Sequence, residues 1–351
     1  MNIKMIIGMN YTLKVVKIKQ ETSDTVTLCF KQPGLKKIKY LAGQYLTLIF
    51  RINGRRFIRP YSFSSCPVVD EFLEITVKRV LNGIVSNHIN DRVCVGDSIE
   101  VMPPMGDFTY SNAGDKKEVF LWGVGSGITP LLSITKYVLH NETETTVHLV
   151  FGNKNHESTI FLNQILSLKD QYKDRFVLTH FFTQPLISID EERIIQGRIN
   201  TFHALDILNK TADLQNTLHY ICGPAGLKES VKAALFKSDI SEEKVFVEEF
   251  EIVKDPADFV DIHTQVVGLK FNGEHYNLEV SKGKSILEAA LDSNIELPYS
   301  CQTGNCNTCL GKLTQGKSKM IGLDKKRQDL SLNEYLLCCT YPLTNDVHIE
   351  I

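Results

Sequence analysis

The sequence has no long hydrophobic run, no excess of charge of one sign and a single tryptophan among its 351 residues. No apolar stretch approaches the ~20 residues of a membrane-spanning helix, so we expect no membrane span. The formal net charge of -2 disfavours a nucleic-acid-binding protein, which neutralises phosphates with surplus Lys and Arg. Internal repeats and low-complexity tracts are also lacking. The chain therefore reads as globular, and its length predicts two or three domains.

Cysteine is present in an odd number, nine, which disfavours a full set of disulfides. Residues 1–9 have too short an apolar run to form the hydrophobic part of a signal peptide. We therefore expect a reducing, cytoplasmic setting in which thiolates bind a metal.

Three cysteines lie in one short loop, and an adjacent pair follows near the C-terminus. Cys301, Cys306 and Cys309 have the spacing C-x4-C-x2-C, and Cys338 and Cys339 are the candidates for a fourth thiol. This spacing is typical of a plant-type [2Fe-2S] cluster. Zinc is the alternative, although its sites usually combine two short C-x2-4-C pairs. The sequence thus favours a one-electron carrier in this region.

The residues around this loop predict a small domain. Residues 266–271 and 275–280 have the pattern of two strands around an Asn-Gly turn, and residues 285–291 that of a helix with a serine cap. Residues 335–342 resemble the ferredoxin pattern L-x-C-x-x-Y-P, which selects Cys338 as the fourth ligand and leaves Cys339 as a buried thiol. Residues 263–351 as a whole resemble a β-grasp ferredoxin domain.

The middle of the chain has the pattern of a nucleotide-binding unit. An apolar run at residues 119–122 leads into G-V-G-S-G-I-T-P at residues 123–130, and a helix is predicted at residues 131–139. Strand, glycine turn and helix in this order can place a pyrophosphate at a helix N-terminus. The spacing differs from the G-x-G-x-x-G fingerprint, so the loop alone is equally consistent with a tight turn.

Further elements in this region indicate a doubly wound parallel sheet. Strands are predicted at residues 147–152, 218–221 and 246–250, with a helix at residues 227–236. Cys222-Gly223-Pro224 follows one of these strands. This tripeptide is consistent with a simple strand-to-helix turn. Because the glycine loop is also present, we favour the interpretation that it forms the opposite wall of a nicotinamide pocket.

The N-terminal third predicts an antiparallel β-barrel, because residues 25–30, 45–50 and 73–78 alternate or are rich in β-branched side chains. This part contains Arg59-Pro60-Tyr61-Ser62 and, further along, a turn from Gly83 to Ser86. Arginine beside an aromatic ring and a hydroxyl can hold a phosphate, stack on a flat ring and donate a hydrogen bond. A surface arginine next to a core tyrosine is, however, the more frequent situation.

Taken in order, R-x-Y-S, G-x-x-S, G-x-G-x-G-x-x-P, C-G-P and C-x4-C-x2-C resemble the ferredoxin–NADP reductase superfamily with a C-terminal [2Fe-2S] domain. The most similar members by pattern are reductase components of multicomponent oxygenases, such as phenylacetyl-CoA epoxidase and ketosteroid hydroxylase reductases. The resemblance implies a multi-domain fold. Its expected parts are an antiparallel β-barrel FAD domain (9–112), an α/β doubly wound NAD(P) domain (113–253), a linker (254–262) and a β-grasp ferredoxin domain (263–351).

The resemblance also implies roles for residues of the barrel. Arg59 is expected to pair with the flavin pyrophosphate, Tyr61 to stack on the isoalloxazine ring, and Ser62 to lie near flavin N5. The remaining expected FAD contacts are Pro60, Lys78, Gly83 and Ser86. A second phosphate contact of this kind favours FAD over FMN.

For the nucleotide, the resemblance places Cys222 beside the nicotinamide ring and matches Glu248 to the glutamate of an E-R-F strand, whose arginine is Glu249 here. Ser62, Cys222 and Glu248 are the expected catalytic residues. The expected lining of the NAD(P)H site is Gly125, Gly127, Thr129, Pro130, Gly223 and Pro224.

Both NADH and NADPH are compatible with the sequence. NADPH-using relatives commonly have Ser-Arg where this chain has Thr183-Gln184. Lys154 could supply the positive charge that a 2′-phosphate needs, while Glu157 would repel it.

These parts predict an NAD(P)H-dependent electron-transfer reductase. A nicotinamide gives up two electrons as hydride, a [2Fe-2S] cluster accepts one at a time, and a flavin can connect the two. The expected cluster ligands are Cys301, Cys306, Cys309 and Cys338. The predicted acceptor is an oxygenase component that docks over residues 303–308, with free ferredoxin, flavodoxin or quinone-like acceptors as the alternative. A redox sensor, the third hypothesis, would need an added DNA-binding or signalling module, which the sequence does not display.

Overall fold

The computed structural model describes residues 10–34, 37–111, 117–184, 194–211, 213–252, 254–323 and 327–351. The chain divides into two compact units. One contains Tyr11–Leu46 and Tyr61–Glu249, and the other contains Thr47–Pro60 and Phe250–Ile351. Of the predicted domain boundaries, residues 9, 112, 113 and 253 lie outside the described residues.

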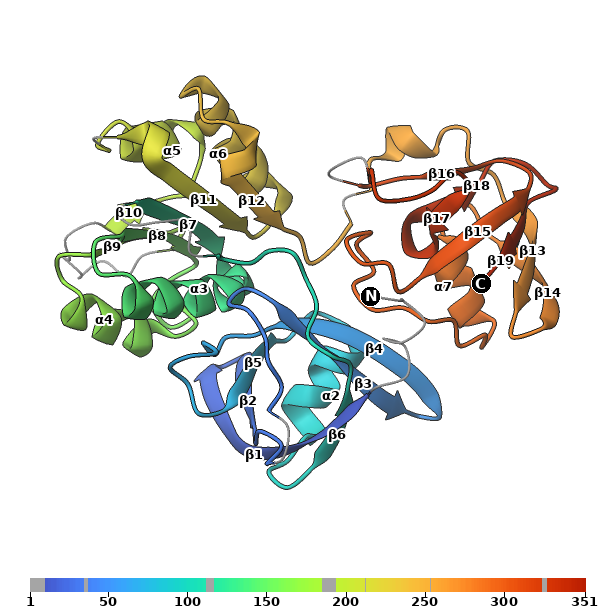
Figure 1. The fold of residues 1–351 in the computed structure, drawn as a ribbon, viewed down its shortest axis with the longest axis horizontal. Coiled ribbons are helices and arrows are strands. Elements are labelled where there is room, and N and C mark those ends of the chain that lie inside the picture. Colours follow the sequence, from blue (N-terminus) through green and yellow to red (C-terminus); the bar gives the residue numbers. More distant parts are fainter. Residues whose placement is uncertain are drawn as a thin grey trace. The chain divides into compact units, whose positions relative to one another are not determined.

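The N-terminal strands form a six-stranded sheet in the order β4-β3-β6-β1-β2-β5 (Figure 1). Its elements are β1 (Tyr11–Thr22), β2 (Thr25–Phe30), β3 (Tyr45–Ile52), β4 (Arg55–Ser62), β5 (Leu73–Lys78), α2 (Ile84–Arg92) and β6 (Ser98–Val101). β2 pairs antiparallel with β1 and β5. An antiparallel bridge between Phe63, directly after β4, and Ile75 on β5 closes the sheet into a barrel.

The middle of the chain forms a parallel sheet in the order β10-β9-β8-β7-β11-β12. Its strands are β7 (Glu118–Val124), β8 (Thr146–Asn153), β9 (Phe176–Phe182), β10 (Ile194–Gln196), β11 (Thr217–Cys222) and β12 (Val245–Glu248). Its helices are η1 (Gly125–Gly127), α3 (Ile128–Asn141), α4 (Leu162–Gln171), α5 (Thr201–Leu208), η2 (Leu214–Asn216), α6 (Ala225–Lys237) and η3 (Glu242–Lys244).

Helices cover both faces of this sheet, α3 and α4 on one and α5 and α6 on the other (Figure 1). Successive residues of β7 face opposite ways, as in any strand. Val119 and Leu121 pack with the α3 side, whereas Phe120 and Trp122 pack with the α5 side. The doubly wound arrangement follows from this two-sided hydrophobic pattern.

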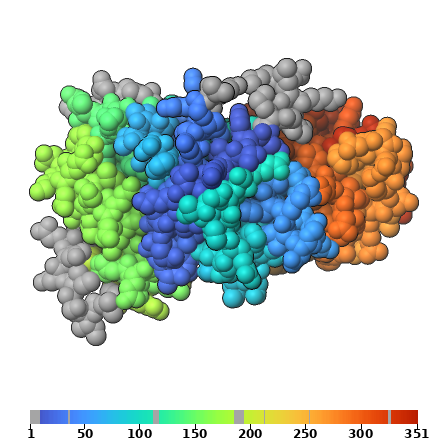
Figure 2. All heavy atoms as spheres, turned by 90° about the horizontal axis from the view of Figure 1, so that it is seen from below, coloured from blue at the N-terminus to red at the C-terminus, as the bar shows by residue number. Residues whose placement is uncertain are grey.

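The barrel and the parallel sheet share one hydrophobic core. Ala42, Phe108 and Tyr110 from the barrel side belong to the same buried cluster as Ile134 of α3. Figure 2 shows blue atoms of the barrel lying directly against green atoms of the α/β domain. This shared core explains why most of the barrel and the whole parallel sheet belong to a single compact unit.

The C-terminal region forms a five-stranded mixed sheet in the order β14-β13-β19-β15-β17, beside a two-stranded sheet of β16 and β18. Its elements are η4 (Pro256–Phe259), β13 (Gln265–Phe271), β14 (Glu274–Val280), α7 (Ile286–Asp292), β15 (Leu310–Gln315), β16 (Ser318–Met320), β17 (Glu334–Leu336), η5 (Leu337–Cys339), β18 (Thr340–Pro342) and β19 (His348–Glu350). β13 is parallel to β19 and antiparallel to β14.

Local signals explain two of these elements. Asn272 and Gly273, between β13 and β14, both have positive φ, as a two-residue hairpin turn requires. Ser285 and Glu288 form a reciprocal capping box at the start of α7. In the predicted linker, Phe259 and Ile262 pack with Tyr341 in a buried cluster.

The predicted architecture of barrel, doubly wound sheet and β-grasp domain is confirmed. Two element boundaries differ from expectation. The helix expected at residues 131–139 begins earlier, at Ile128, because Pro130 is tolerated in a first helical turn. The strand expected to reach Phe250 ends at Glu248. None of the helices in the described residues is long and apolar enough to cross a membrane.

Candidate functional site

The predicted flavin motif ends strand β4 where the barrel closes. Ser62 is buried, while Arg59 and Tyr61 are half-buried. Arg59 Nη1 donates to the carbonyl oxygen of Ile58 at 2.8 Å. A guanidinium and an aromatic ring with partly exposed surfaces suit an anion and a flat ring system.

The turn before α2 is held by its own serine. The backbone N–H of Val80 donates to Ser86 Oγ at 3.1 Å, and that hydroxyl donates to Gly83 O at 3.4 Å. A Cβ at Gly83 would lie 2.5 Å from Ser86 Oγ, so the turn needs glycine. Gly83 provides no side-chain cap, and the uncapped N-terminus of a helix attracts phosphate. Lys78 Nζ forms an ion pair with Asp24 Oδ2 at 3.5 Å.

The predicted nucleotide loop is packed tightly against the end of β11. Gly125 has φ +56°, and a Cβ at Gly127 would lie 2.0 Å from the carbonyl oxygen of Cys222. Thr129 Oγ1 donates to Ser126 O at 3.0 Å, which closes the first turn of α3 together with Pro130. The glycine loop and the Cys222 turn are therefore in direct backbone contact.

Two of the predicted catalytic residues are neighbours across the sheet. Cys222 pairs with Glu248 on one side and with Gly123 on the other. Burial raises the pKa of the Cys222 thiol well above its usual range, and the negative charge of Glu248 adds to this effect. The thiol is therefore neutral and can serve as a packing surface for a ring. The Glu249 carboxylate, at the expected position of the E-R-F arginine, accepts a hydrogen bond from Lys228 of α6.

The glycine turn Cys222-Gly223-Pro224 leads directly into α6, for which Pro224 is the residue before the first turn. A Cβ at Gly223 would lie 2.9 Å from a methyl carbon of Leu227 and 3.3 Å from Val124. This close approach keeps the turn next to the glycine loop, in which Val124 is the last residue of β7.

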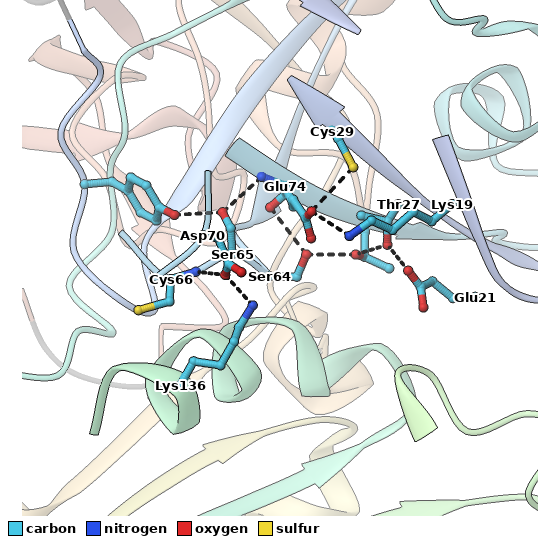
Figure 3. A network of polar contacts seen from close by, with 12 residues as sticks. Lys19, Glu21, Thr27, Cys29, Ser64, Ser65, Cys66, Asp70, Glu74 and Lys136 are labelled. Carbon is cyan, nitrogen blue, oxygen red and sulfur yellow. Dashed lines mark hydrogen bonds and ion pairs between the residues drawn. The ribbon is translucent and has the colours of Figure 1, made fainter. Parts of the chain in front are cut away.

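Sequence reasoning did not identify the residues that connect α3 to the barrel, among them Lys136 and Asp70, which are labelled in Figure 3. Ser133 Oγ donates to Ser65 O at 2.6 Å, and Lys136 Nζ donates to Asp70 Oδ2 at 2.5 Å. The Lys136 side chain is only 5% exposed. The same Asp70 oxygen accepts the backbone N–H of Cys66 at 2.6 Å. The helix that begins in the nucleotide loop is thereby tied to the segment that follows Tyr61 and Ser62.

A polar network extends from this connection into the barrel (Figure 3). Ser65 Oγ is bonded to Tyr40 and to the backbone N–H of Glu74. The Glu74 carboxylate accepts from Lys19 Nζ at 2.6 Å and from Cys29 Sγ at 3.5 Å. Burial, aided by the Glu74 charge, raises the pKa of Cys29 to about 12, so this thiol is unreactive at neutral pH.

Thr183 and Gln184, the residues that bear on the choice between NADH and NADPH, are hydrogen-bonded through their backbone to the end of β8. The N–H of Thr183 donates to Asn153 O at 3.1 Å, and that of Gln184 donates to Lys154 O at 2.8 Å. Lys154 and Glu157 are both exposed. Pro185, the residue after Gln184, lies outside the described residues.

The four predicted cluster ligands approach one another in pairs. The thiols of Cys306 and Cys338 donate to Cys301 and lower its pKa, and that of Cys338 lowers the pKa of Cys309. The backbone N–H groups of Cys306 and Thr303 point at Cys301 Sγ, at 3.3 and 3.5 Å. Such N–H···S contacts are typical of iron–sulfur sites.

The described residues contain no group of three or more His, Cys, Asp or Glu side chains placed to hold a metal ion. The hydrogen bonds among the four thiols nevertheless place them close enough to suit a cluster in which each iron takes two thiolates. Cys339 differs from Cys338, since its thiol donates to the backbone oxygen of Leu336 at 3.3 Å.

The cysteine loop also contacts the β3–β4 hairpin of its own compact unit. Tyr299 OH accepts the N–H of Ile58 at 3.1 Å, and Gln302 Nε2 donates to Ile58 O at 3.4 Å. Thr47 and Ser300 are joined through their hydroxyls at 2.8 Å. The strand that carries Arg59 is thus hydrogen-bonded to residues on both sides of Cys301.

Three family models match the chain. They are an oxidoreductase FAD-binding domain at residues 12–110, an oxidoreductase NAD-binding domain at residues 121–233 and a 2Fe-2S iron-sulfur cluster binding domain at residues 269–343. Among curated proteins, a subunit of the 1,2-phenylacetyl-CoA epoxidase from Escherichia coli is 30% identical, over 97% of this chain and 97% of its own length.

The chain belongs to the ferredoxin–NADP reductase superfamily with a C-terminal [2Fe-2S] domain. The ferredoxin reductase component of 3-ketosteroid-9-alpha-monooxygenase from Rhodococcus rhodochrous is also 30% identical, with 96% of each chain covered. Among solved structures, phthalate dioxygenase reductase has a TM-score of 0.68 and 22% identity, covering 97% of this chain and 98% of its own. That likeness supports the fold.

The reductase is an NAD(P)H-dependent oxidoreductase with FAD and [2Fe-2S] as its cofactors. Together these groups supply the chemistry that passes the two electrons of NAD(P)H onward one at a time. The contribution of the protein is to bind and orient these groups.

Proposed function

We propose that this reductase delivers electrons from NAD(P)H, by way of FAD and the [2Fe-2S] cluster, to an oxygenase component that hydroxylates or epoxidises an organic substrate. The observation that carries the proposal is the full-length match to reductase components of such systems. A glycine betaine monooxygenase reductase subunit from Chromohalobacter salexigens, 25% identical over 95% of this chain, extends the pattern to a third kind of oxygenase.

Within this proposal, Arg59 and the uncapped start of α2 hold the FAD pyrophosphate, and Tyr61 stacks on the isoalloxazine ring. Ser62 would lie near flavin N5, and Cys222 would lie close to the nicotinamide ring. The half-exposure of Arg59 and Tyr61 and the neutrality of the buried Cys222 thiol support these roles.

The further FAD contacts are proposed to be Pro60, Lys78, Gly83 and Ser86. The NAD(P)H site is proposed to be lined by Gly125, Gly127, Thr129, Pro130, Gly223 and Pro224, with Glu248 beside Cys222. The cluster ligands are proposed to be Cys301, Cys306, Cys309 and Cys338. In the cysteine loop, Asn305 is exposed whereas Thr303 and Gly304 are buried. Asn305 is therefore the proposed contact residue for the acceptor protein.

A reducing, cytoplasmic setting forms part of the proposal. All nine cysteines are free, as thiolate ligands and reduced buried thiols require.

The test is an anaerobic titration of the purified protein with NADH and, in a parallel sample, NADPH, followed by visible and EPR spectroscopy. We expect flavin bleaching and a rhombic S = 1/2 signal that is lost in a Cys306→Ser variant. The nucleotide that bleaches the flavin at lower concentration is the preferred donor. Bleaching without any cluster signal would overturn the proposed electron path.

The acceptor is tested by adding any oxygenase component encoded beside this reductase, or a free ferredoxin or flavodoxin, to the NAD(P)H-reduced protein. Fast cluster reoxidation coupled to substrate oxygenation supports the oxygenase partner. Fast reoxidation by the small carriers alone would identify a stand-alone reductase instead.

A further inference from the structure

Arg327 spans the cysteine loop with its guanidinium. Nη1 donates to Gly304 O at 2.5 Å, and Nη2 donates to the side-chain oxygen of Asn307. Gly304 lies between Cys301 and Cys306, and Asn307 lies between Cys306 and Cys309. One side chain therefore bonds to both arms of the loop, each of which lies between two predicted ligands.

The guanidinium is fixed in place by Asp329. Nε and Nη2 of Arg327 each donate to one Asp329 carboxylate oxygen at 2.7 Å, the two-pronged geometry that makes arginine–carboxylate pairs strong. Asn307 Nδ2 donates to Asp329 Oδ2 at 3.2 Å and completes a ring of contacts. Arg327 holds the pKa of Asp329 well below its usual range, so both groups are charged at neutral pH.

Burial differs between the two partners. The Arg327 side chain is 17% exposed, whereas that of Asp329 is 51% exposed. The positive charge is therefore better shielded from water than the negative one. The loop beneath is tightly seated, since Gly304 has φ +77° and a Cβ there would lie 2.3 Å from Leu323 Cδ2.

We propose that Arg327 and Asp329 are positioning residues that hold the cysteine loop and tune the reduction potential of its cluster in opposite directions. Reduction adds one electron to the cluster, so a nearby positive charge favours the reduced form and a nearby negative charge opposes it. The proposal rests on the [2Fe-2S] cluster being held by this loop, and it is independent of the terminal acceptor.

The test is spectroelectrochemical titration of the cluster in the full chain, with FAD bound, for three variants. Arg327→Gln should shift the midpoint potential to a more negative value, and Asp329→Asn should shift it to a more positive value. The double variant should return toward the wild-type potential. A residue pair that only supported the loop would shift both single variants in the same direction, and that outcome, like no shift at all, would overturn the proposal.

A matched control is the exposed pair Lys270–Glu350, which joins β13 to β19 rather than the cysteine loop. Lys270→Gln and Glu350→Gln make the same charge changes and should leave the potential within error of wild type, because solvent and salt screen exposed charges. Shifts as large as those of the Arg327 and Asp329 variants would mean a general charge effect and would overturn the proposal.

Hydrogen exchange of the cluster-free protein provides a second readout. Amides of residues 301–310 should exchange roughly tenfold faster or more in Arg327→Gln, because two charge-assisted contacts to the loop are lost. Unchanged exchange would contradict the positioning role even if the variant failed to take up a cluster. A wild-type protein without any [2Fe-2S] signal would instead refute the cluster itself, so the two failures are distinguishable.

Discussion

Gly127 shows how closely two chain segments approach at the residue scale. The space for its Cβ is already occupied by the Cys222 carbonyl oxygen, 2.0 Å from the ideal position. No real Cβ makes such a contact, so any larger residue must displace the nucleotide loop from the end of β11. The neighbouring helix α6 offers a contrast, since Gly226 has nothing within 4 Å of its Cβ position.

We therefore expect Gly127→Ala to slow flavin reduction by NAD(P)H about 100-fold, the effect of roughly a 1 Å misplacement of reacting groups. Stopped-flow absorbance at saturating nucleotide measures this rate. Gly226→Ala is the control and should leave the rate unchanged, with stability equal to or about 0.5–1 kcal/mol above wild type. Equal rates for both variants would show that the loop does not position the nucleotide.

The adjacent thiols Cys338 and Cys339 provide a second comparison between single residues. Cys338 interacts with Cys301, Cys309 and Cys339, whereas the Cys339 thiol donates to the backbone oxygen of Leu336. Cys338→Ser should abolish the cluster absorbance and EPR signal, while Cys339→Ser should retain both. The opposite result would assign the fourth ligand to Cys339.

At the scale of elements, α3 connects the two sites of the larger unit. Its first turn forms the nucleotide loop, and its second and third turns carry Ser133 and Lys136, which bond the barrel segment from Ser65 to Asp70. A shift of this helix would therefore move the nucleotide relative to the flavin motif. The nearly buried charge of Lys136 makes its pairing with Asp70 worth more than an exposed ion pair.

Breaking this pair should destabilise the unit and slow hydride transfer together. Lys136→Met and Asp70→Asn should each lower the free energy of unfolding by about 1.5–3 kcal/mol, the range for hydrogen bonds to charged groups. Urea titration followed by flavin fluorescence measures this free energy, and a double-mutant cycle should show strong non-additivity.

The control is Lys210→Met, which breaks an exposed pair with Asp206 and should lower the free energy of unfolding by less than about 0.5 kcal/mol. Additive effects of the first two changes would mean that the pair does not act as a unit.

At the scale of the whole molecule, the chain forms two compact units. One contains the nucleotide motif and Tyr61 and Ser62 of the flavin motif, and the other contains the cysteine loop together with Arg59 and Pro60. The four predicted cluster ligands all lie in the second unit, so cluster binding stabilises that unit. Multi-domain proteins with tightly bound groups commonly depart from two-state unfolding.

We accordingly expect two thermal transitions, one reported by flavin fluorescence and one by cluster absorbance. Cys306→Ser should remove the stabilisation that metal binding gives to the cysteine unit and lower the calorimetric transition of that unit alone. The flavin transition serves as the internal control. A single transition that shifts as a whole in Cys306→Ser would contradict the independence of the units.

Local pattern alone predicted much of this protein. The strands β2 and β5 lie at the residues expected from alternation and β-branching, and the hairpin turn at Asn272 follows from turn chemistry. The motif residues of the flavin, nucleotide and cluster sites could be named because their spacing along the chain carries the chemistry. Their individual roles stay predictions.

The residues that connect these motifs could not be found in this way, because their partners are distant in the sequence. Lys136 and Asp70 are 66 residues apart, and Arg327 lies 23 residues from Gly304. Taken alone, each reads as an ordinary surface charge. Spacing and periodicity are properties of neighbouring residues, so the chain could specify its elements and cofactor motifs by itself. Burial and pairing of charges arise only when remote segments pack, so only the tertiary structure decides which of them position a site.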